Sequence, residues 1–188
     1  MSARVVVALT GASGAIYGIR ALEMLRQAGV ETHLVLSPAA RVTIAQETDR
    51  KVSEVADLAS VHHDPHDIGA SIASGSFATR GMIVIPCSIK TLSAIAHSYA
   101  DNLIGRAADV TLKEGRPLVL VVRETPLHLG HLRLMAAATE AGAVIFPPVP
   151  AFYGRPGSLD ELVTQTVGRA LLRLGIENEG YARWEGLG

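Results

Sequence analysis

The amino-acid sequence predicts one doubly wound α/β domain, Rossmann-like or flavodoxin-like, spanning residues 1–188, with a parallel sheet and helices on both faces. Three observations lead to this prediction. Five short apolar runs alternate along the chain with segments of helical spacing. The runs are largely apolar from end to end, as expected of strands covered on both faces. No linker, repeat or low-complexity stretch divides the 188 residues, a length that suits one domain.

The first part of the chain predicts two strand–helix units. Each begins with a run rich in β-branched residues and continues, after a short turn, with apolar residues at helical spacing. These strands and helices are predicted at Val5–Leu9, Ala15–Gln27, Thr32–Leu36 and Pro38–Thr48. The proline opens its helix, a position where its missing N–H is tolerated. The stretch that follows, Ser53–Ser76, is polar and irregular.

The second part of the chain continues the alternation. Met82–Ile85 predicts a third strand, which Pro86 should halt. The remaining elements are predicted, in order, as helices Thr91–Asn102 and Leu103–Glu114, strand Leu118–Val122, helix Leu127–Ala141, strand Ala143–Phe146 and helix Leu159–Leu174. Ser158 caps the last helix, and Asp160 and Glu161 lie in its first turn, where the helix dipole favours them.

Composition excludes several classes of protein. Apolar residues make up 48% of the chain, enough for a core without disulfides or a structural metal. The net charge of -1 gives no reason to expect a nucleic-acid or acidic-membrane partner. A single cysteine, Cys87, excludes an internal disulfide and fits a reducing compartment. The apolar runs are too short for a signal segment or a membrane span, so we expect a cytoplasmic protein.

Ligands of such folds bind beyond the carboxyl ends of the strands, which directs attention to the first loop, Thr10–Gly14. Glycines there let the backbone approach a ligand, and the next helix offers free N–H groups for a phosphate. Together with Gly18 the spacing is G-x-x-G-x-x-x-G, not the dinucleotide G-x-G-x-x-G, and the second strand ends at Ser37 rather than at an acid. The pattern favours a mononucleotide such as FMN over NAD. A turn that serves only strand–helix packing is the alternative.

The third strand leads into a second group of polar residues. Ser88 and Thr91 open the next helix, so their hydroxyls and the free amides face the same crevice. Helix capping alone would explain both residues equally well. No histidine or aspartate pattern supports Cys87 as a nucleophile, so we expect a small buried thiol.

Cations gather in the second half of the chain, at Arg106, Lys113, Arg116, Arg123, Arg133, Arg155 and Arg169. Arg106 and Lys113 are seven residues apart and therefore lie on one helix face. Arg123 and Tyr153-Gly154-Arg155 follow strand ends. A phosphate ester needs such groups, and arginine offers two parallel donors, although any single one of these cations is most simply explained as solvated.

Acidic residues and histidines give weaker signals. Glu47 and Glu124 could handle protons, although ordinary ion pairs would explain either one. The run His62–Asp67 and the pair His128 and His131 resemble metal ligands. The run is better explained as a polar, solvated loop, and the pair has no third ligand in the sequence. We therefore expect no metal.

Taken in order, many segments resemble the UbiX-type flavin prenyltransferases. In the first half they are Thr10-Gly11-Ala12-Ser13-Gly14-Ala15, Glu47-Thr48-Asp49, Ala73-Ser74-Gly75-Ser76, Pro86-Cys87-Ser88 and Thr91-Leu92-Ser93. In the second half they are Asn102-Leu103-Ile104, Arg106-Ala107-Ala108-Asp109-Val110, Leu112-Lys113-Glu114, Arg116-Pro117-Leu118-Val119, Arg123-Glu124-Thr125-Pro126, Gly142-Ala143-Val144-Ile145, Pro147-Pro148, Phe152-Tyr153 and Arg183-Trp184. The ordered set covers almost the whole chain and is highly specific.

The resemblance implies an enzyme that joins the dimethylallyl group of dimethylallyl monophosphate to N5 and C6 of reduced FMN. Its product, prenylated FMN, would serve a UbiD-type decarboxylase. The resemblance also implies a metal-independent reaction and a homo-oligomer, a dodecamer, whose sites form where subunits meet.

The resemblance assigns roles by motif. It places FMN on Gly11, Ala12, Ser13, Ser37, Ser88, Ile89, Lys90, Thr91 and Arg123, with the flavin phosphate on the glycine turn. It places the phosphate of the prenyl donor on Arg106, Lys113, Tyr153 and Arg169. Ser13 and Glu47 match positions linked to proton handling, Glu124 is nearby, and Trp184 lines an aromatic wall. The side chains of Ile89 and Lys90 matter less if the backbone binds the flavin, and His62–Asp67 inherits no role.

Three alternatives remain. An FMN-dependent decarboxylase of peptidyl or pantothenoyl cysteine shares the fold but uses a Pro-x-Met-Asn-x-x-Met-Trp segment, where this chain has Phe146–Pro156. A non-catalytic FMN carrier would not need a second phosphate site. A dehydrogenase is less favoured, because no Tyr-x-x-x-Lys pair accompanies the glycine loop.

Overall fold

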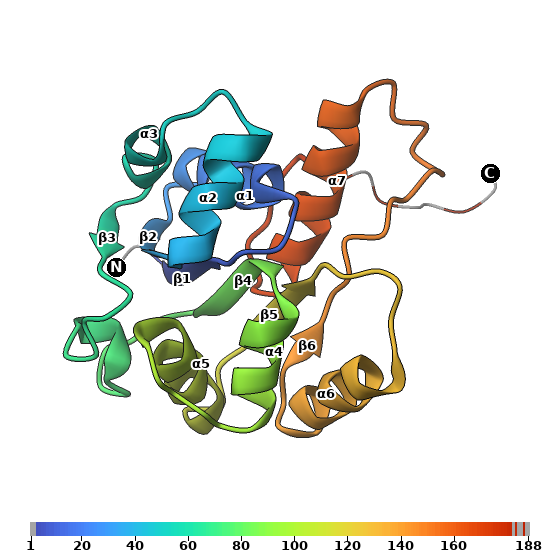
Figure 1. Cartoon of the computed structure of the whole chain (residues 1–188). Helices are drawn as coiled ribbons and strands as arrows, with labels where there is room; N and C mark the ends of the chain where they lie inside the picture. The colour runs from blue at the N-terminus through green and yellow to red at the C-terminus, as the bar shows by residue number, and fades with distance from the viewer. Residues whose placement is uncertain (1–2, 182, 184–185, 187–188) are drawn as a thin grey trace.

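A six-stranded parallel sheet forms the centre of the molecule (Figure 1). The computed structural model describes residues 3–181, 183 and 186. The strands are β1 (Arg4–Leu9), β2 (Glu31–Leu36), β3 (Val61–His63), β4 (Gly81–Cys87), β5 (Leu118–Val122) and β6 (Val144–Ile145). Their order in the sheet is β3-β2-β1-β4-β5-β6. The predicted doubly wound parallel fold is therefore confirmed.

Helices cover both faces of the sheet (Figure 1). One layer consists of α1 (Ala15–Gln27), α2 (Pro38–Glu47), α3 (Val52–Ala56) and α7 (Leu159–Leu172). The other consists of α4 (Ile89–Ala96), α5 (Leu103–Lys113) and α6 (Leu129–Glu140), preceded by the 3-10 turn η1 (Ser71–Ala73). None of the helices within the described residues is both long and apolar enough to cross a membrane.

The strands supply two cores because successive side chains point to opposite faces. In β1, Val5, Val7 and Leu9 pack with the layer that contains α1 and α7, and Val6 and Ala8 pack with the layer that contains α4 and α5. All five side chains are at most 2% exposed. Burial on both faces explains why the strands read as continuous apolar runs in the sequence.

The sheet order fixes the place of a binding crevice. The chain winds outward from β1 through β2 to β3, and then returns to place β4 on the other side of β1. Loops that follow β1 and β4 therefore leave the sheet towards opposite helix layers and separate. A ligand of a doubly wound fold binds at this switch point.

Two segments differ from the predictions. The polar stretch Ser53–Ser76 contains α3, the edge strand β3 and η1, which the sequence pattern did not reveal. Strand β3 pairs on one side only and is exposed to half-buried, so it needs no apolar run. Pro86 does not halt β4: the strand continues to Cys87, with a register shift between Val84 and Cys87.

The helix after β4 is also shorter than predicted. It ends at Ala96, and Asn102 belongs to the next helix as its N-cap, accepting a hydrogen bond from the Gly105 amide at 3.1 Å. A turn therefore separates α4 from α5. The sequence predicts two helices here but places them end to end, and the apolar pattern does not show the turn between them because both helices pack on the same face of the sheet.

Candidate functional site

A cavity of about 910 Å³ lies beyond the carboxyl ends of β1, β2 and β4. Thr10 and Gly11 follow β1, Ser37 follows β2 and Ser88 follows β4, as the fold rule predicts. The start of α5 also lines the cavity, through Asn102, Ile104 and Gly105. The full lining is Thr10, Gly11, Ser37, Pro38, Ala39, Pro65, His66, Ser88, Lys90, Thr91, Ser93, Ala94, His97, Tyr99, Asp101, Asn102, Ile104 and Gly105. Sequence reasoning missed the contribution of Pro65 and His66 and of the segment 97–105.

Two helix starts face this cavity, each capped by a serine. Ser37 Oγ accepts a hydrogen bond from the Ala40 amide at 3.0 Å, and Ser88 Oγ accepts one from the Thr91 amide at 3.3 Å. The capping interpretation is therefore correct for Ser88, and Ser37 caps α2 in the same way. Capping does not exclude a ligand, because free amides of the first helical turn remain beside each cap. Ile89 is partly buried against the core and is not among the residues that line the cavity.

The glycine turn after β1 already holds a carboxylate. Gly14 is the N-cap of α1 with φ 102°, a conformation that favours glycine. Its amide and that of Ala15 donate hydrogen bonds to Glu47 Oε2 at 2.8 and 2.9 Å. Negative charge is favoured at this helix end. The anion found there is a side chain of α2, so these two amides are not free for a flavin phosphate.

Glu47 interacts with the other groups of the N-terminal loop that the sequence predicts to be reactive. Its pKa lies below the ordinary 4.5: burial raises it, but hydrogen bonds from Ala15, Gly14 and the Ser13 hydroxyl, together with the charge of Arg123, outweigh burial. Glu47 is therefore a carboxylate at neutral pH. Burial also raises the pKa of Tyr17, against the opposing charge of Arg123. Ser13 and Glu47, assigned separately from the sequence, therefore interact, and the charge of Arg123 is close enough to act on Glu47.

A second cluster joins the loop after β6 to α7. Arg169 Nη1 donates a hydrogen bond to the Tyr181 hydroxyl at 2.6 Å, and the hydroxyls of Tyr153 and Tyr181 lie 2.8 Å apart. The guanidinium carbon of Arg169 is 5.5 Å from the centre of the Tyr181 ring. The predicted pair Tyr153 and Arg169 is thus brought together. Tyr181 was missed, and no motif pointed to it.

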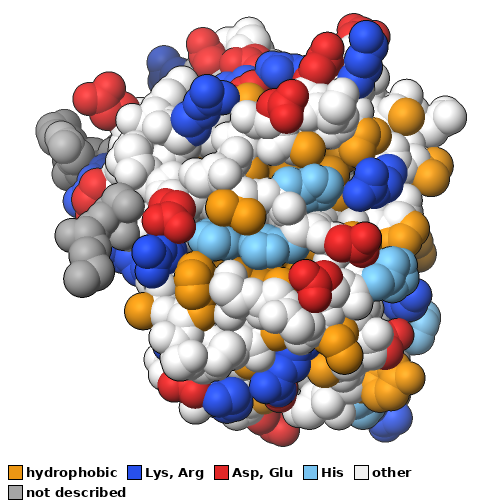
Figure 2. All heavy atoms as spheres, turned by 90° about the vertical axis from the view of Figure 1, so that its left-hand side faces the viewer, with side chains coloured by type: hydrophobic (Ala, Val, Ile, Leu, Met, Phe, Trp, Pro, Cys, Tyr) orange, Lys and Arg blue, Asp and Glu red, His pale blue; other side chains and the backbone are white. Residues whose placement is uncertain are grey.

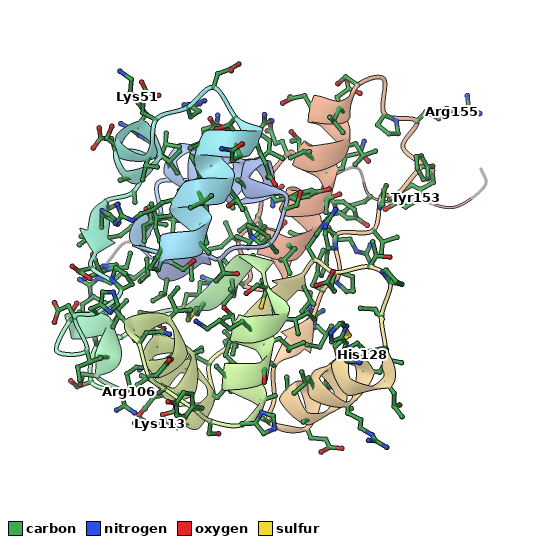
Figure 3. The ribbon with its side chains drawn as sticks, viewed as in Figure 1. Lys51, Arg106, Lys113, His128, Tyr153 and Arg155 are labelled. Atoms are coloured by element: carbon green, nitrogen blue, oxygen red, sulfur yellow. The ribbon has the colours of Figure 1, made fainter. Side chains whose placement is uncertain are left out.

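The other predicted donor ligands, Arg106 and Lys113, lie elsewhere. Figure 3 shows both beside α5, on the opposite side of the molecule from Tyr153. Arg106 contacts Asp109 at 2.9 Å and donates to the Ala73 carbonyl at 3.2 Å. Lys113 pairs with Glu114 at 2.6 Å. One chain therefore does not unite the four predicted phosphate ligands.

Two further predicted site residues are not placed in either cluster. Glu124 is exposed, and its Oε1 accepts a hydrogen bond from the amide of the next residue, Thr125, at 3.0 Å. Trp184 lies outside the described residues.

Four of the histidines form two close pairs. Figure 2, which faces the side of β3, shows several histidine side chains among carboxylates and apolar groups. There His33 Nδ1 is 2.9 Å from His63 Nε2, and His33 Nε2 is 3.0 Å from Glu31 Oε1. The rings of His128 and His131 are 3.6 Å apart. Within the described part of the chain, no group of three or more His, Cys, Asp or Glu residues could hold a metal ion.

Cys87 is expected to be unreactive in the folded protein. Its side chain is buried, and burial raises the pKa of the thiol to about 12. Iodoacetamide at about pH 8 should therefore leave the native protein unmodified and alkylate the urea-unfolded protein fully, because the thiolate is the nucleophile. Intact-protein mass spectrometry measures both. Rapid alkylation of the native protein would show that the thiol is accessible and acidic.

Comparisons with known proteins agree with this geometry. A family model described as Flavoprotein matches residues 1–153. The flavin prenyltransferase UbiX of Escherichia coli K12 is 62% identical over 186 residues, which cover 97% of this chain and 98% of that protein. The structure of AnUbiX in complex with FMN and dimethylallyl pyrophosphate has a TM-score of 0.98 and 53% identity over 100% of both chains. A dodecameric FMN-dependent UbiX-like decarboxylase from Escherichia coli O157:H7 has a TM-score of 0.94 and 50% identity, covering 97% of this chain and 100% of that one.

Proposed function

Because the chain belongs to the Flavoprotein family and, within it, to the UbiX flavin prenyltransferases, we propose that it joins the dimethylallyl group of dimethylallyl monophosphate to N5 and C6 of reduced FMN. Bound reduced FMN would supply the nucleophile, and the donor would release inorganic phosphate as the flavin takes up C5H8. Prenylated FMN would then serve a UbiD-type decarboxylase. We take residues 1–188 as one flavoprotein domain that works without a metal.

One observation carries the proposal: a cavity of mononucleotide size adjoins a cluster of reactive side chains. About 910 Å³ is within the range of small-molecule sites. Thr10 and Gly11 line it and lead directly into the turn that bears Ser13, which hydrogen-bonds Glu47. FMN in the cavity would therefore lie beside a hydroxyl, a carboxylate and the Arg123 guanidinium.

The structure favours a revised place for the flavin phosphate. Glu47 occupies the Gly14 and Ala15 amides, and a second anion there would be repelled. The starts of α2 and α4 instead offer the Ser37 and Ser88 hydroxyls and first-turn amides such as those of Ala39 and Lys90, residues that line the cavity, whereas Pro38 has no amide hydrogen to contribute. We assign the phosphate to these two helix starts rather than to the glycine turn.

The donor site is proposed to form between copies of the chain. Tyr153 and Arg169 lie together, and Arg106 and Lys113 lie on the opposite side of the molecule (Figure 3). A departing phosphate needs several cations around it. A neighbouring copy in an oligomer such as the dodecamer of the related E. coli O157:H7 protein would bring α5 of one chain to the Tyr153–Arg169 pair of another.

The single thiol bears on the cellular compartment in which the enzyme works. We propose that the enzyme works in the cytoplasm, in agreement with a lone buried thiol that has no disulfide partner among the described residues. Reduced FMN and a phosphate ester are substrates that such a reducing compartment can supply.

The decisive experiment uses the purified full chain with FMN, dithionite and dimethylallyl monophosphate. We expect the flavin extracted after anaerobic incubation to be heavier by one C5H8 unit, and inorganic phosphate to appear in equal amount. Mass spectrometry and a phosphate assay measure the two products.

The alternatives give different results in the same experiment. A carrier would bind FMN and return it with unchanged mass. A cysteine decarboxylase would also return unchanged flavin, but would release CO2 from a peptidyl or pantothenoyl cysteine. Unchanged flavin from protein that demonstrably binds FMN would overturn the prenyltransferase assignment.

A further inference from the structure

The hydroxyl of Tyr181 connects the loop after β6 with helix α7. The Tyr181 hydroxyl accepts a hydrogen bond from Arg169 Nη1 at 2.6 Å and lies 2.8 Å from the Tyr153 hydroxyl. Tyr153 and Arg169 come from different segments and both are exposed. A hydroxyl oxygen can take part in two such contacts at once, so Tyr181 fixes the spacing between the phenol of Tyr153 and the guanidinium of Arg169.

The segment that carries Tyr181 is built to hold it there. After α7 the chain folds back over Gly168, whose added Cβ would lie 3.0 Å from the Gly180 carbonyl carbon and 3.1 Å from the Tyr181 amide nitrogen. Only a residue without a side chain allows this approach. Asn178 secures the turn by donating to the Gly168 carbonyl at 3.0 Å and accepting from the Gly180 amide at 3.1 Å. Tyr181 is thereby placed beside Arg169, the residue next to Gly168.

Electrostatics agree with this geometry. The hydrogen bond between the two phenols and the positive charge of Arg169 lower the pKa of Tyr181, whereas the same hydrogen bond raises the pKa of Tyr153. The Tyr181 hydroxyl thus contacts both groups to which the donor phosphate is assigned, and holds their polar ends side by side.

We propose that Tyr181 is a positioning residue of the prenyl-donor site, holding Tyr153 and Arg169 in the arrangement that receives the phosphate of dimethylallyl monophosphate. The inference rests on the proposed function. Two exposed side chains must be immobilised to bind a phosphate, which costs conformational entropy. This entropic cost is lower when a third residue has already fixed the two side chains. Tyr181 acts through its two neighbours and not on the flavin.

Tyr181→Phe tests the inference. We expect the KM for dimethylallyl monophosphate to rise about tenfold, with kcat within about twofold of wild type and FMN affinity unchanged, because ordering of two side chains is lost but no reacting group is removed. A defect of folding would instead lower FMN binding and kcat. An unchanged or lowered donor KM would overturn the proposal.

Gly168→Ala is a second variant that keeps the hydroxyl. The added Cβ would meet Asn178 Oδ1 at 2.6 Å, so the segment must move away from α7, while alanine in a helix interior does not weaken the helix itself. The donor KM should rise as for Tyr181→Phe. Glu177→Gln is the matched control, because it breaks an exposed ion pair with Arg183 in the same segment and should change nothing.

A double-mutant cycle separates positioning from independent effects. If Tyr181 acts through Arg169 and Tyr153, then Tyr181→Phe should raise the donor KM less in an Arg169→Ala background than in wild type, and should have no further effect once Tyr153→Phe is added. Additive effects would show that Tyr181 acts independently of Arg169 and would overturn the proposal. If the wild-type enzyme does not prenylate FMN, the proposed function fails; if it does and Tyr181→Phe is unaltered, only the present inference fails.

Discussion

Glu47→Gln is expected to lower kcat for prenyl transfer by about 10² to 10³-fold while FMN remains bound. The carboxylate accepts hydrogen bonds from the Gly14 and Ala15 amides and from the Ser13 hydroxyl, beside the charge of Arg123. Glutamine keeps the shape but removes the charge, and it can accept through one oxygen only. The Gly14 and Ala15 amides and the Ser13 hydroxyl must then share one uncharged acceptor. Single-turnover kinetics with preloaded, reduced FMN measures the loss.

The pH dependence of the same variant follows from the depressed pKa of Glu47. A carboxyl group whose folded-state pKa is below its ordinary 4.5 stabilises the fold at pH values above 4.5, and that stability is lost as the pH falls through the folded-state pKa. The difference in Tm between wild type and Glu47→Gln should therefore be constant near neutral pH and vanish in acid. A difference that grows as the pH falls would contradict this role.

Glu54→Gln is the matched control for Glu47. Glu54 also accepts a hydrogen bond from a backbone amide at a helix start, that of Lys51 at 2.9 Å, but it caps α3 and does not line the cavity. Its replacement should leave kcat unchanged. A similar loss in both variants would show that helix capping, and not chemistry at the site, explains the effect of Glu47.

Mixed oligomers of Arg106→Ala and Arg169→Ala are expected to regain activity that neither variant has alone. Each substitution removes a cation from a departing phosphate, which should lower kcat by about 10² to 10³-fold. If each site takes α5 from one copy and Arg169 from another, co-expression produces sites in which both contributions are intact. With equal amounts of the two chains, about a quarter of the sites should be complete.

The control for this experiment mixes two variants that both alter the Tyr153–Arg169 cluster. Arg169→Ala mixed with Tyr153→Phe should recover nothing, since Tyr153 and Arg169 lie together in one chain. The rate of C5H8 addition to FMN measures both mixtures. Failure of Arg106→Ala and Arg169→Ala to complement each other would place the four ligands in separate sites.

The sequence is sufficient to predict the sheet and both helix layers, because strands buried on two faces must be apolar throughout. It does not reveal β3, since Val61–His63 lies at the sheet edge, pairs with β2 alone and can stay polar. It also does not reveal that β4 continues past Pro86, because the register shift that accommodates the proline depends on its neighbours in the sheet.

The sequence predicts which residues line the cavity where chain position determines spatial position. Gly11, Ser37 and Ser88 follow strand ends, and parallel strands bring their carboxyl ends to one edge. Prediction fails for His66 and Tyr181, whose places depend on distant contacts. The Leu103 amide donates to the Pro65 carbonyl at 2.8 Å and draws the loop with His66 to the cavity, and the turn over Gly168 brings Tyr181 to α7. No local pattern encodes either contact.

Helix α5 serves two places at once. Its first turn, with Ile104 and Gly105, lines the cavity, and the following residues of the same helix include Arg106 and Lys113. The buried face of α5, which includes Leu103 and Ala107, packs against the sheet. Because this packing is tight, the helix can move only as one rigid unit. A substitution in that buried face that tilts the helix would disturb the cavity at one end and Arg106 and Lys113 further along, so the proposed flavin site and the proposed donor site cannot be adjusted separately.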